Sequence, residues 1–164
     1  MTTEVQEPAS AAPSSPYDWA GGMAALETLT EAFYGKVNAD PLLQPVFAKM
    51  DPEHPRHVAR FLAEVFGGPK AYSESHGGHA EMIRHHLGRH LQEAQRRRWV
   101  QLLIDAADEI GLPDDPEFRS SFVAYIEWGT RLAVINSQPG AEVAEEQPMP
   151  QWGWGETKGP YVAP

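Results

Sequence analysis

The spacing of apolar residues along the chain is the feature that most constrains its fold. Leu26, Leu29, Phe33 and Val37 recur at intervals of three and four residues, which places them on one face of an amphipathic helix. The same spacing recurs in residues 58–65, 99–110 and 118–135. No segment shows the alternation of apolar and polar residues that is typical of a half-buried strand. The sequence therefore predicts an all-α domain of about five helices joined by short glycine and proline turns.

Stretches rich in glycine and proline mark the expected ends of the helices. The first long helix ends at "NADPLL", and the second closes at "GGP", residues 67–69. A short helix is predicted from Met82 to His86, interrupted at Gly88. Two longer helices follow over residues 95–110 and 118–135, separated by "GLPDDP".

Composition divides the chain into three parts. Residues 1–16 are rich in Pro, Ser and Ala and are predicted to be a disordered arm. Residues 17–137 carry the helical core. Residues 138–164 contain too much Pro and Gly for a helix, yet include Trp152, Trp154 and Tyr161. We expect this tail either to dock on the core in an extended conformation or to recruit a partner.

Charge and composition exclude several classes of function. The 164 residues suit one domain, and the absence of cysteine excludes disulfides and thiolate ligands. A formal charge of −10 disfavours nucleic-acid binding. The one basic run, Arg96 to Arg98, is interpreted as a solvated helix face. No run could cross a membrane, and the first residues do not have the pattern of a secretory signal, so a cytoplasmic location is expected.

All seven histidines lie between His54 and His90, and three of them are close together at His85, His86 and His90. Three interpretations are open. They could be surface residues. They could form a zinc or non-haem iron site through His86 and His90, although Gly88 weakens the helix between them.

The third interpretation is a haem pocket, which needs one neutral imidazole, an apolar slot and hydrogen-bond donors for a bound ligand. Met82 precedes His86 by one turn and Leu91 follows it, so apolar side chains flank His86. His85 instead has Glu81 one turn before it. The periodicity therefore favours His86 as the ligand.

At these residues the sequence resembles the group II truncated haemoglobins, a family with a shortened, two-over-two globin fold. The resemblance covers roughly Tyr17 to Ser137. It rests on "GG" at 21–22, "EAFYGKVNADPLLQPVF" at 31–47, "FLAEVFGGPKAYS" at 61–73 and the "GH" pair at 78–79, which occur in the order found in that family.

The resemblance implies a haem b cofactor with His86 as its axial iron ligand. His86 lies eight residues after Gly78 and thirteen before Trp99, as the family pattern requires. The chain departs from that pattern at Arg89, where an aromatic residue is usual, at His85, where Arg is usual, and by one extra residue in "SHGGH". An alignment shifted by that residue would make His85 the ligand.

The remaining site residues are implied in the same way. Tyr34, His54 and Trp99 match the distal tyrosine, the gate residue and the tryptophan that points at a bound ligand. The residues implied to contact the cofactor, besides His86, are Phe47, Val58, Phe61, Tyr72, Met82 and Leu91.

Such a protein would bind dioxygen, NO and CO and would use them in redox chemistry, either NO detoxification or peroxidase-like turnover, with an unidentified reductase. A homodimer is left open. One alternative is a haem-dependent interaction or sensor protein that signals through its aromatic tail. The other is a non-haem metal enzyme that uses His86 and His90.

Overall fold

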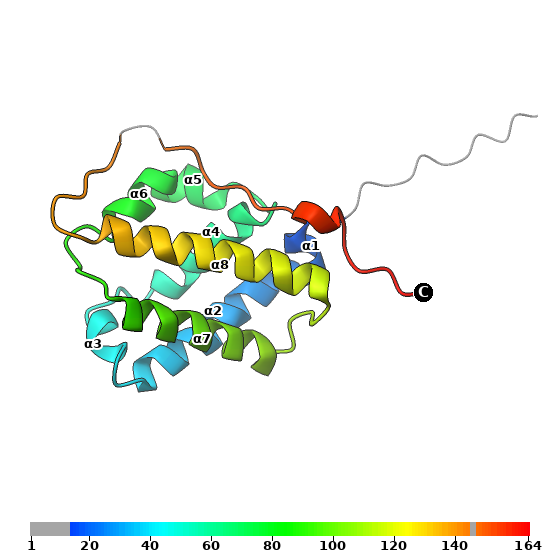
Figure 1. Ribbon diagram of the computed structural model, residues 1–164, viewed down its shortest axis with the longest axis horizontal. Helices are drawn as coiled ribbons and strands as arrows, with labels where there is room; N and C mark the ends of the chain where they lie inside the picture. Colours follow the sequence, from blue (N-terminus) through cyan, green and yellow to red (C-terminus); the bar gives the residue numbers. More distant parts are fainter. Residues whose placement is uncertain (1–13, 145–146) are drawn as a thin grey trace, which may run out of the picture.

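The structure, a computed structural model, describes residues 14–144 and 147–164. Over these residues the chain forms eight α-helices, one 3₁₀ turn and no strand (Figure 1). The elements are α1 (Pro16–Ala20), α2 (Gly22–Ala39), α3 (Gln44–Phe47), α4 (His54–Val65), α5 (Ala71–His76), α6 (Gly78–Arg84), α7 (Glu93–Glu109), α8 (Pro116–Asn136) and η1 (Gly155–Thr157).

The prediction of an all-α fold is confirmed, but the expected number of about five helices is too low. The four long helices α2, α4, α7 and α8 lie close to their predicted positions. The predicted short helix corresponds to α6, and the additional helices are α1, α3 and α5, which contain four to six residues each. A helix of at most two turns is too short for an apolar period of 3.6 residues to repeat.

Local capping explains where several helices begin. Ser15 caps α1 by accepting a hydrogen bond from the Asp18 backbone N–H at 3.1 Å. Asp115 caps α8 in the same way through the Phe118 N–H at 3.0 Å. Gly21, with φ of 111°, separates α1 from α2 in a left-handed conformation that suits glycine. These caps satisfy backbone donors that a helix leaves unpaired at its first turn.

The long helices pack as two pairs. α2 packs on α4, and α7 packs on both α8 and α2. In the view of Figure 1, α5 and α6 lie on one side of α8, whereas α2, α3 and α7 lie on the other. The predicted apolar face of α2, which carries Leu26, Leu29, Phe33 and Val37, is completely buried in this core.

The segment around the clustered histidines differs from the expected helix. α6 spans Gly78–Arg84 and therefore ends two residues before His86. Residues 85–88 form a turn in which the His86 N–H donates to the Ile83 carbonyl at 2.9 Å. Gly88 has φ of 75°, so the chain leaves the helix there, as the predicted interruption requires. His86 thus lies in the turn that follows α6.

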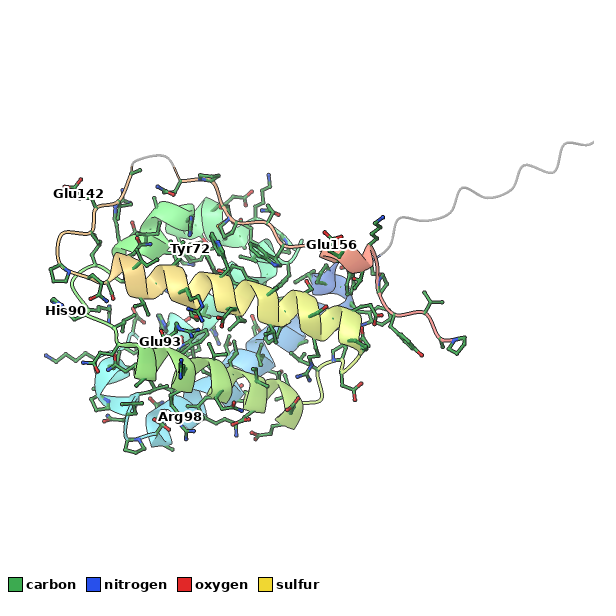
Figure 2. All side chains as sticks on the ribbon, in the orientation of Figure 1. Tyr72, His90, Glu93, Arg98, Glu142 and Glu156 are labelled. Carbon is green, nitrogen blue, oxygen red and sulfur yellow. The ribbon has the colours of Figure 1, made fainter. Side chains whose placement is uncertain are left out.

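The basic run is not a solvated face throughout, and this prediction is wrong for Arg96. Its side chain is 5% exposed, with Nη2 2.6 Å from Glu93 and Nη1 3.1 Å from Glu127 on α8. Arg98 pairs at 2.6 Å with the buried carboxylate of Asp40. Carboxylate partners compensate the cost of removing a guanidinium from water. Figure 2 shows Glu93 and Arg98 along α7.

The tail is docked on the helical core. The Trp152 N–H donates to the Val65 carbonyl at 2.8 Å, and the Ser121 hydroxyl donates to the Gly153 carbonyl at 2.6 Å. Figure 1 shows the tail, in orange and red, running past α5 and α8 towards α1. Of the two expected states of the tail, the structure therefore shows intramolecular docking.

Tyr161 is 45% exposed, so it does not share the burial of the two tail tryptophans. The Trp154 indole donates a hydrogen bond to the Ser14 carbonyl at 2.6 Å. The tail therefore contacts the start of the described chain as well as the helices.

The predicted disordered arm, residues 1–16, falls mostly on residues 1–13, which lie outside the described part of the chain. None of the described helices combines the length and the apolar character that a membrane crossing needs.

Candidate functional site

A cavity of about 450 Å³ opens between α2, α3, α4, the turn after α6, α7 and α8. Its volume falls in the range of about 300–1,000 Å³ that is typical of sites for small molecules and cofactors. Much of its wall is apolar and includes Leu43, Val46, Met50, Ala133 and Val134.

Nine of the ten predicted site residues line this cavity: Tyr34, Phe47, His54, Val58, Phe61, Met82, His86, Leu91 and Trp99. They come from five different segments of the chain, and the fold brings them together. Tyr72 is the exception, because it lies behind the wall. Its fully buried ring packs edge-on against Phe61, with centroids 5.1 Å apart. Tyr72 therefore supports a wall residue and does not itself face the cavity.

Tyr34 and His54 form a hydrogen-bonded pair in the cavity. The Tyr34 hydroxyl lies 2.9 Å from His54 Nε2. Burial raises the pKa of Tyr34, so the phenol keeps its proton. Burial, assisted by positive charge at His85 and His57, lowers the pKa of His54 to about 4. Both groups are therefore neutral at pH 7, and the pair can present a proton to a third group.

Trp99 adds an indole to the same cavity. Its ring packs edge-on against the buried Phe33 ring, with centroids 4.8 Å apart, which fixes its orientation on α7. Among the described residues the indole N–H has no acceptor within hydrogen-bonding distance. A ligand in the cavity can therefore accept a hydrogen bond from it.

His86 presents a neutral imidazole to the cavity. Burial lowers its pKa to about 4, and this effect outweighs the opposing hydrogen bond to the Met82 backbone. The Met82 carbonyl is the acceptor in that bond, so one ring nitrogen carries the proton and the other is free. A backbone acceptor that orients a ring in this way is common for histidine ligands of metals.

The neighbouring histidines differ from His86. The side chain of His85 is 54% exposed, and its Nε2 lies 3.7 Å from Glu81 at the rim of the cavity. His90 does not line the cavity, and Figure 2 shows it at the edge of the molecule. No group of three or more His, Asp or Glu side chains in the described part of the chain could hold a metal ion. A non-haem site built on His86 and His90 therefore has no structural support.

Charged side chains line the mouth of the cavity. Lys49, His57, His85 and Arg89 provide basic groups there, with Asp51 as the acidic neighbour. Lys49 and His57 are not among the residues predicted from the sequence, because they lie in a turn and in the first turn of α4, where no motif marks them. Thr130, Ala133 and Val134 were not predicted either, although their spacing along α8 indicates a shared face.

Comparison with known proteins agrees with this site. The family model for bacterial-like globins matches residues 15–127. The group 2 truncated haemoglobin YjbI of Bacillus subtilis is 34% identical over 125 residues, which are 76% of this chain and 92% of the relative. The group 1 truncated haemoglobin GlbN of Nostoc commune is 38% identical over 81 residues, which are 49% of this chain and 64% of the relative.

Solved structures agree with this assignment. The group II truncated haemoglobin from Bacillus anthracis has a TM-score of 0.69 and 26% identity, over 79% of this chain and 98% of that one. The truncated oxygen-avid haemoglobin from Bacillus subtilis has a TM-score of 0.66 and 30% identity, over 74% and 99%. The chain belongs to the bacterial-like globin family, as a truncated haemoglobin of group II. It is therefore a haem b protein that binds diatomic ligands.

The cavity residues fit haem b. His86 offers the neutral imidazole that haem iron takes as an axial ligand. The apolar wall suits the macrocycle, and the basic rim at Lys49 and Arg89 suits the two propionate groups. The Tyr34–His54 pair and the Trp99 indole could each donate a hydrogen bond to a small ligand inside the cavity.

Proposed function

We propose that this protein uses bound dioxygen in redox chemistry, as NO detoxification or peroxidase-like turnover. The observation that carries the proposal is the hydrogen-bonded Tyr34–His54 pair, which lies in the same cavity as the Trp99 indole. Three polar groups around one small ligand favour its retention and polarisation. A carrier that must release dioxygen quickly does not need so many.

When bound, the haem would bind diatomic ligands and transfer electrons to them. The protein side chains hold and orient the reactants. We assign His86 as the axial ligand, kept in one orientation by the Met82 carbonyl. Tyr34 and Trp99 donate hydrogen bonds to negative charge that develops on the ligand, which is the basis of electrostatic stabilisation in preorganised sites. His54 holds the Tyr34 hydroxyl in place.

Reaction of the dioxygen complex with NO provides the test. The haem-loaded protein is mixed with NO in a stopped-flow instrument, and nitrate is quantified. Peroxide consumption with a small phenol is measured in parallel. Stoichiometric nitrate or steady peroxide turnover supports the proposal. Rapid dioxygen release, with neither product, would refute it. Continuous turnover also needs an electron donor, for which we propose a reductase.

A second candidate is a haem-dependent interaction protein that signals through its tail. Tyr161 and Val162 are 45% and 82% exposed, so the end of the tail is accessible to a partner. Limited proteolysis of the tail, with and without CO on the haem, tests this alternative. Equal cleavage rates would exclude a ligand-dependent tail. A cytoplasmic location and a homodimer remain predictions.

A further inference from the structure

A continuous series of aromatic rings connects the cavity wall with the protein surface. Phe61 lines the cavity, and its ring centroid lies 6.4 Å from that of Tyr125. The Tyr125 ring is 5.5 Å from Trp152 and 6.1 Å from Trp128. The two indoles are 5.4 Å apart. Each separation lies within the range of direct contact between aromatic rings.

Burial changes along this series. Tyr125 is 6% exposed, and burial raises the pKa of its phenol. Its hydroxyl donates to no acceptor among the described residues. Oxidation of a phenol requires a proton acceptor, so Tyr125 is a poor place for a lasting radical. Trp128 is 40% exposed, and its oxidised indole can release a proton to water and meet a molecule from solution.

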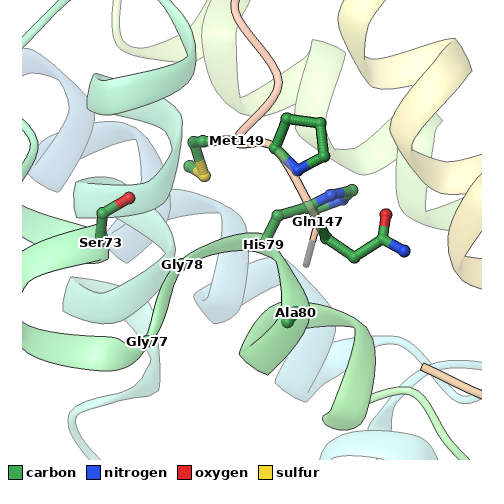
Figure 3. A pocket seen from close by; sticks show the side chains of 8 residues that line it. Ser73, Gly77, Gly78, His79, Ala80, Gln147 and Met149 are labelled. Atoms are coloured by element: carbon green, nitrogen blue, oxygen red, sulfur yellow. The ribbon is translucent and has the colours of Figure 1, made fainter. Parts of the chain in front are cut away.

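A residue of the tail, Trp152, packs against the surface end of this aromatic series. Trp152 is held against the core by its N–H bond to Val65 and by the bond from Ser121 to Gly153. Figure 3 shows the tail at Gln147 and Met149 next to His79, at the start of α6. The His79 ring stacks on Trp128, with centroids 6.2 Å apart. Trp128 is thus fixed between a histidine and a tail tryptophan, with one part of its ring facing solvent.

We propose that Trp128, backed by Tyr125 and Trp152, is a second oxidation site for phenols and aromatic amines that cannot enter the cavity. Electrons pass singly from the bound phenol to Trp128 and then through the aromatic series to the cavity. This inference rests on the proposed peroxidase-like turnover, in which hydrogen peroxide is the oxidant.

The reaction balances as one peroxide and two phenols. In the cavity the O–O bond breaks, and the peroxide takes up two electrons and two protons to become two waters. At the surface each phenol gives one electron to oxidised Trp128 and one proton to water, and leaves as a phenoxyl radical. The two protons consumed in the cavity are replaced from solvent.

Trp154 supplies a matched control. Like Trp152 it is a half-buried tryptophan of the tail, and it contacts the Trp19 ring at 6.2 Å. Among the described residues neither of these two rings contacts a ring of the series from Phe61 to Trp128. Substitution of Trp154 therefore removes an indole of similar burial without interrupting the path.

The haem-loaded full-length protein is treated with one equivalent of hydrogen peroxide, and protein radicals are followed by freeze-quench electron paramagnetic resonance. Spin trapping and peptide mapping locate them. We expect an adduct on the peptide that contains Trp128 in the unsubstituted protein and in Trp154→Phe. Trp128→Phe should lose it, and Trp128→Tyr should show a tyrosyl signal instead. Oxidation of a phenol linked to dextran should be lost in Trp128→Phe and restored in Trp128→Tyr.

The outcomes separate the inference from the function on which it rests. If no form of the protein consumes peroxide, the peroxidase proposal and this inference both fail. If peroxide is consumed but the adduct lies elsewhere, the inference alone is wrong. It is also wrong if Trp128→Phe oxidises the dextran-linked phenol as fast as the unsubstituted protein. Should Trp128→Phe fold poorly, as judged by circular dichroism, Tyr125→Phe provides the second interruption, because Tyr125 is the ring between Phe61 and Trp128 and a phenyl ring is much harder to oxidise than a phenol; the same loss is expected.

Discussion

Docking of the tail makes a quantitative prediction for Trp152→Ala. A fully enclosed tryptophan buries about 150–250 Å², which corresponds to about 4–6 kcal/mol at about 25 cal/mol per Å². Trp152 is only partly buried against Tyr125 and Trp128, and a released tail regains chain entropy. Because the burial is partial and the released tail regains entropy, we expect the free energy of unfolding to fall by only about 2 kcal/mol.

Urea unfolding of the haem-loaded protein, followed by far-ultraviolet circular dichroism, measures this loss. For a chain of this size a slope of about 2 kcal/mol per M places the expected fall in the midpoint at about 1 M. Tyr161→Ala is the control, because Tyr161 is an exposed aromatic residue of the same tail and should shift the midpoint little. Equal shifts for the two variants would show that the docking of Trp152 adds no stability and would refute the reasoning.

Three predictions concern the cavity. His86→Ala should abolish stable haem incorporation, as seen by loss of the Soret band, whereas His85→Ala should retain it; the reverse would make His85 the ligand. Tyr34→Phe and Trp99→Phe should each speed dioxygen release roughly ten- to a hundredfold, since a hydrogen bond to a charged acceptor contributes about 1.5–3 kcal/mol; unchanged rates in laser photolysis or stopped-flow would show that neither group contacts the ligand. Burial lowers the pKa of His54 from its ordinary 6.5 to about 4, so between these values the unfolded state binds the extra proton and stability falls as the pH drops. The expected loss is about 2 kcal/mol between pH 7 and pH 5 and about 3 kcal/mol over the whole window. His54→Gln should remove this part of the loss in urea unfolding at pH 7 and pH 5; an equal loss in the variant would contradict the assignment.

The long helices and the candidate axial ligand could be read from the sequence because both depend on local order. The apolar face of α2 repeats every three or four residues, so its burial follows from spacing alone. The apolar neighbours Met82 and Leu91 favour His86 over His85 as the candidate ligand, and the resemblance to the truncated haemoglobins implies the same residue through the counts from Gly78 and to Trp99. Tyr34, His54 and Trp99 could be named by their resemblance to a family, although nothing in their own neighbourhoods indicates that they meet.

Tertiary structure decided the features that depend on distant partners. Arg96 is buried because Glu127, thirty-one positions away, lies beside it on α8, and a local run of three arginines gives no sign of that carboxylate. Tyr72 lies behind Phe61 because α5 packs on the far side of α4. The tail docks because Trp152 finds Tyr125 and Trp128 on another segment. The aromatic residues of the tail favour its burial, but only the packed helices determine which part of the core the tail contacts.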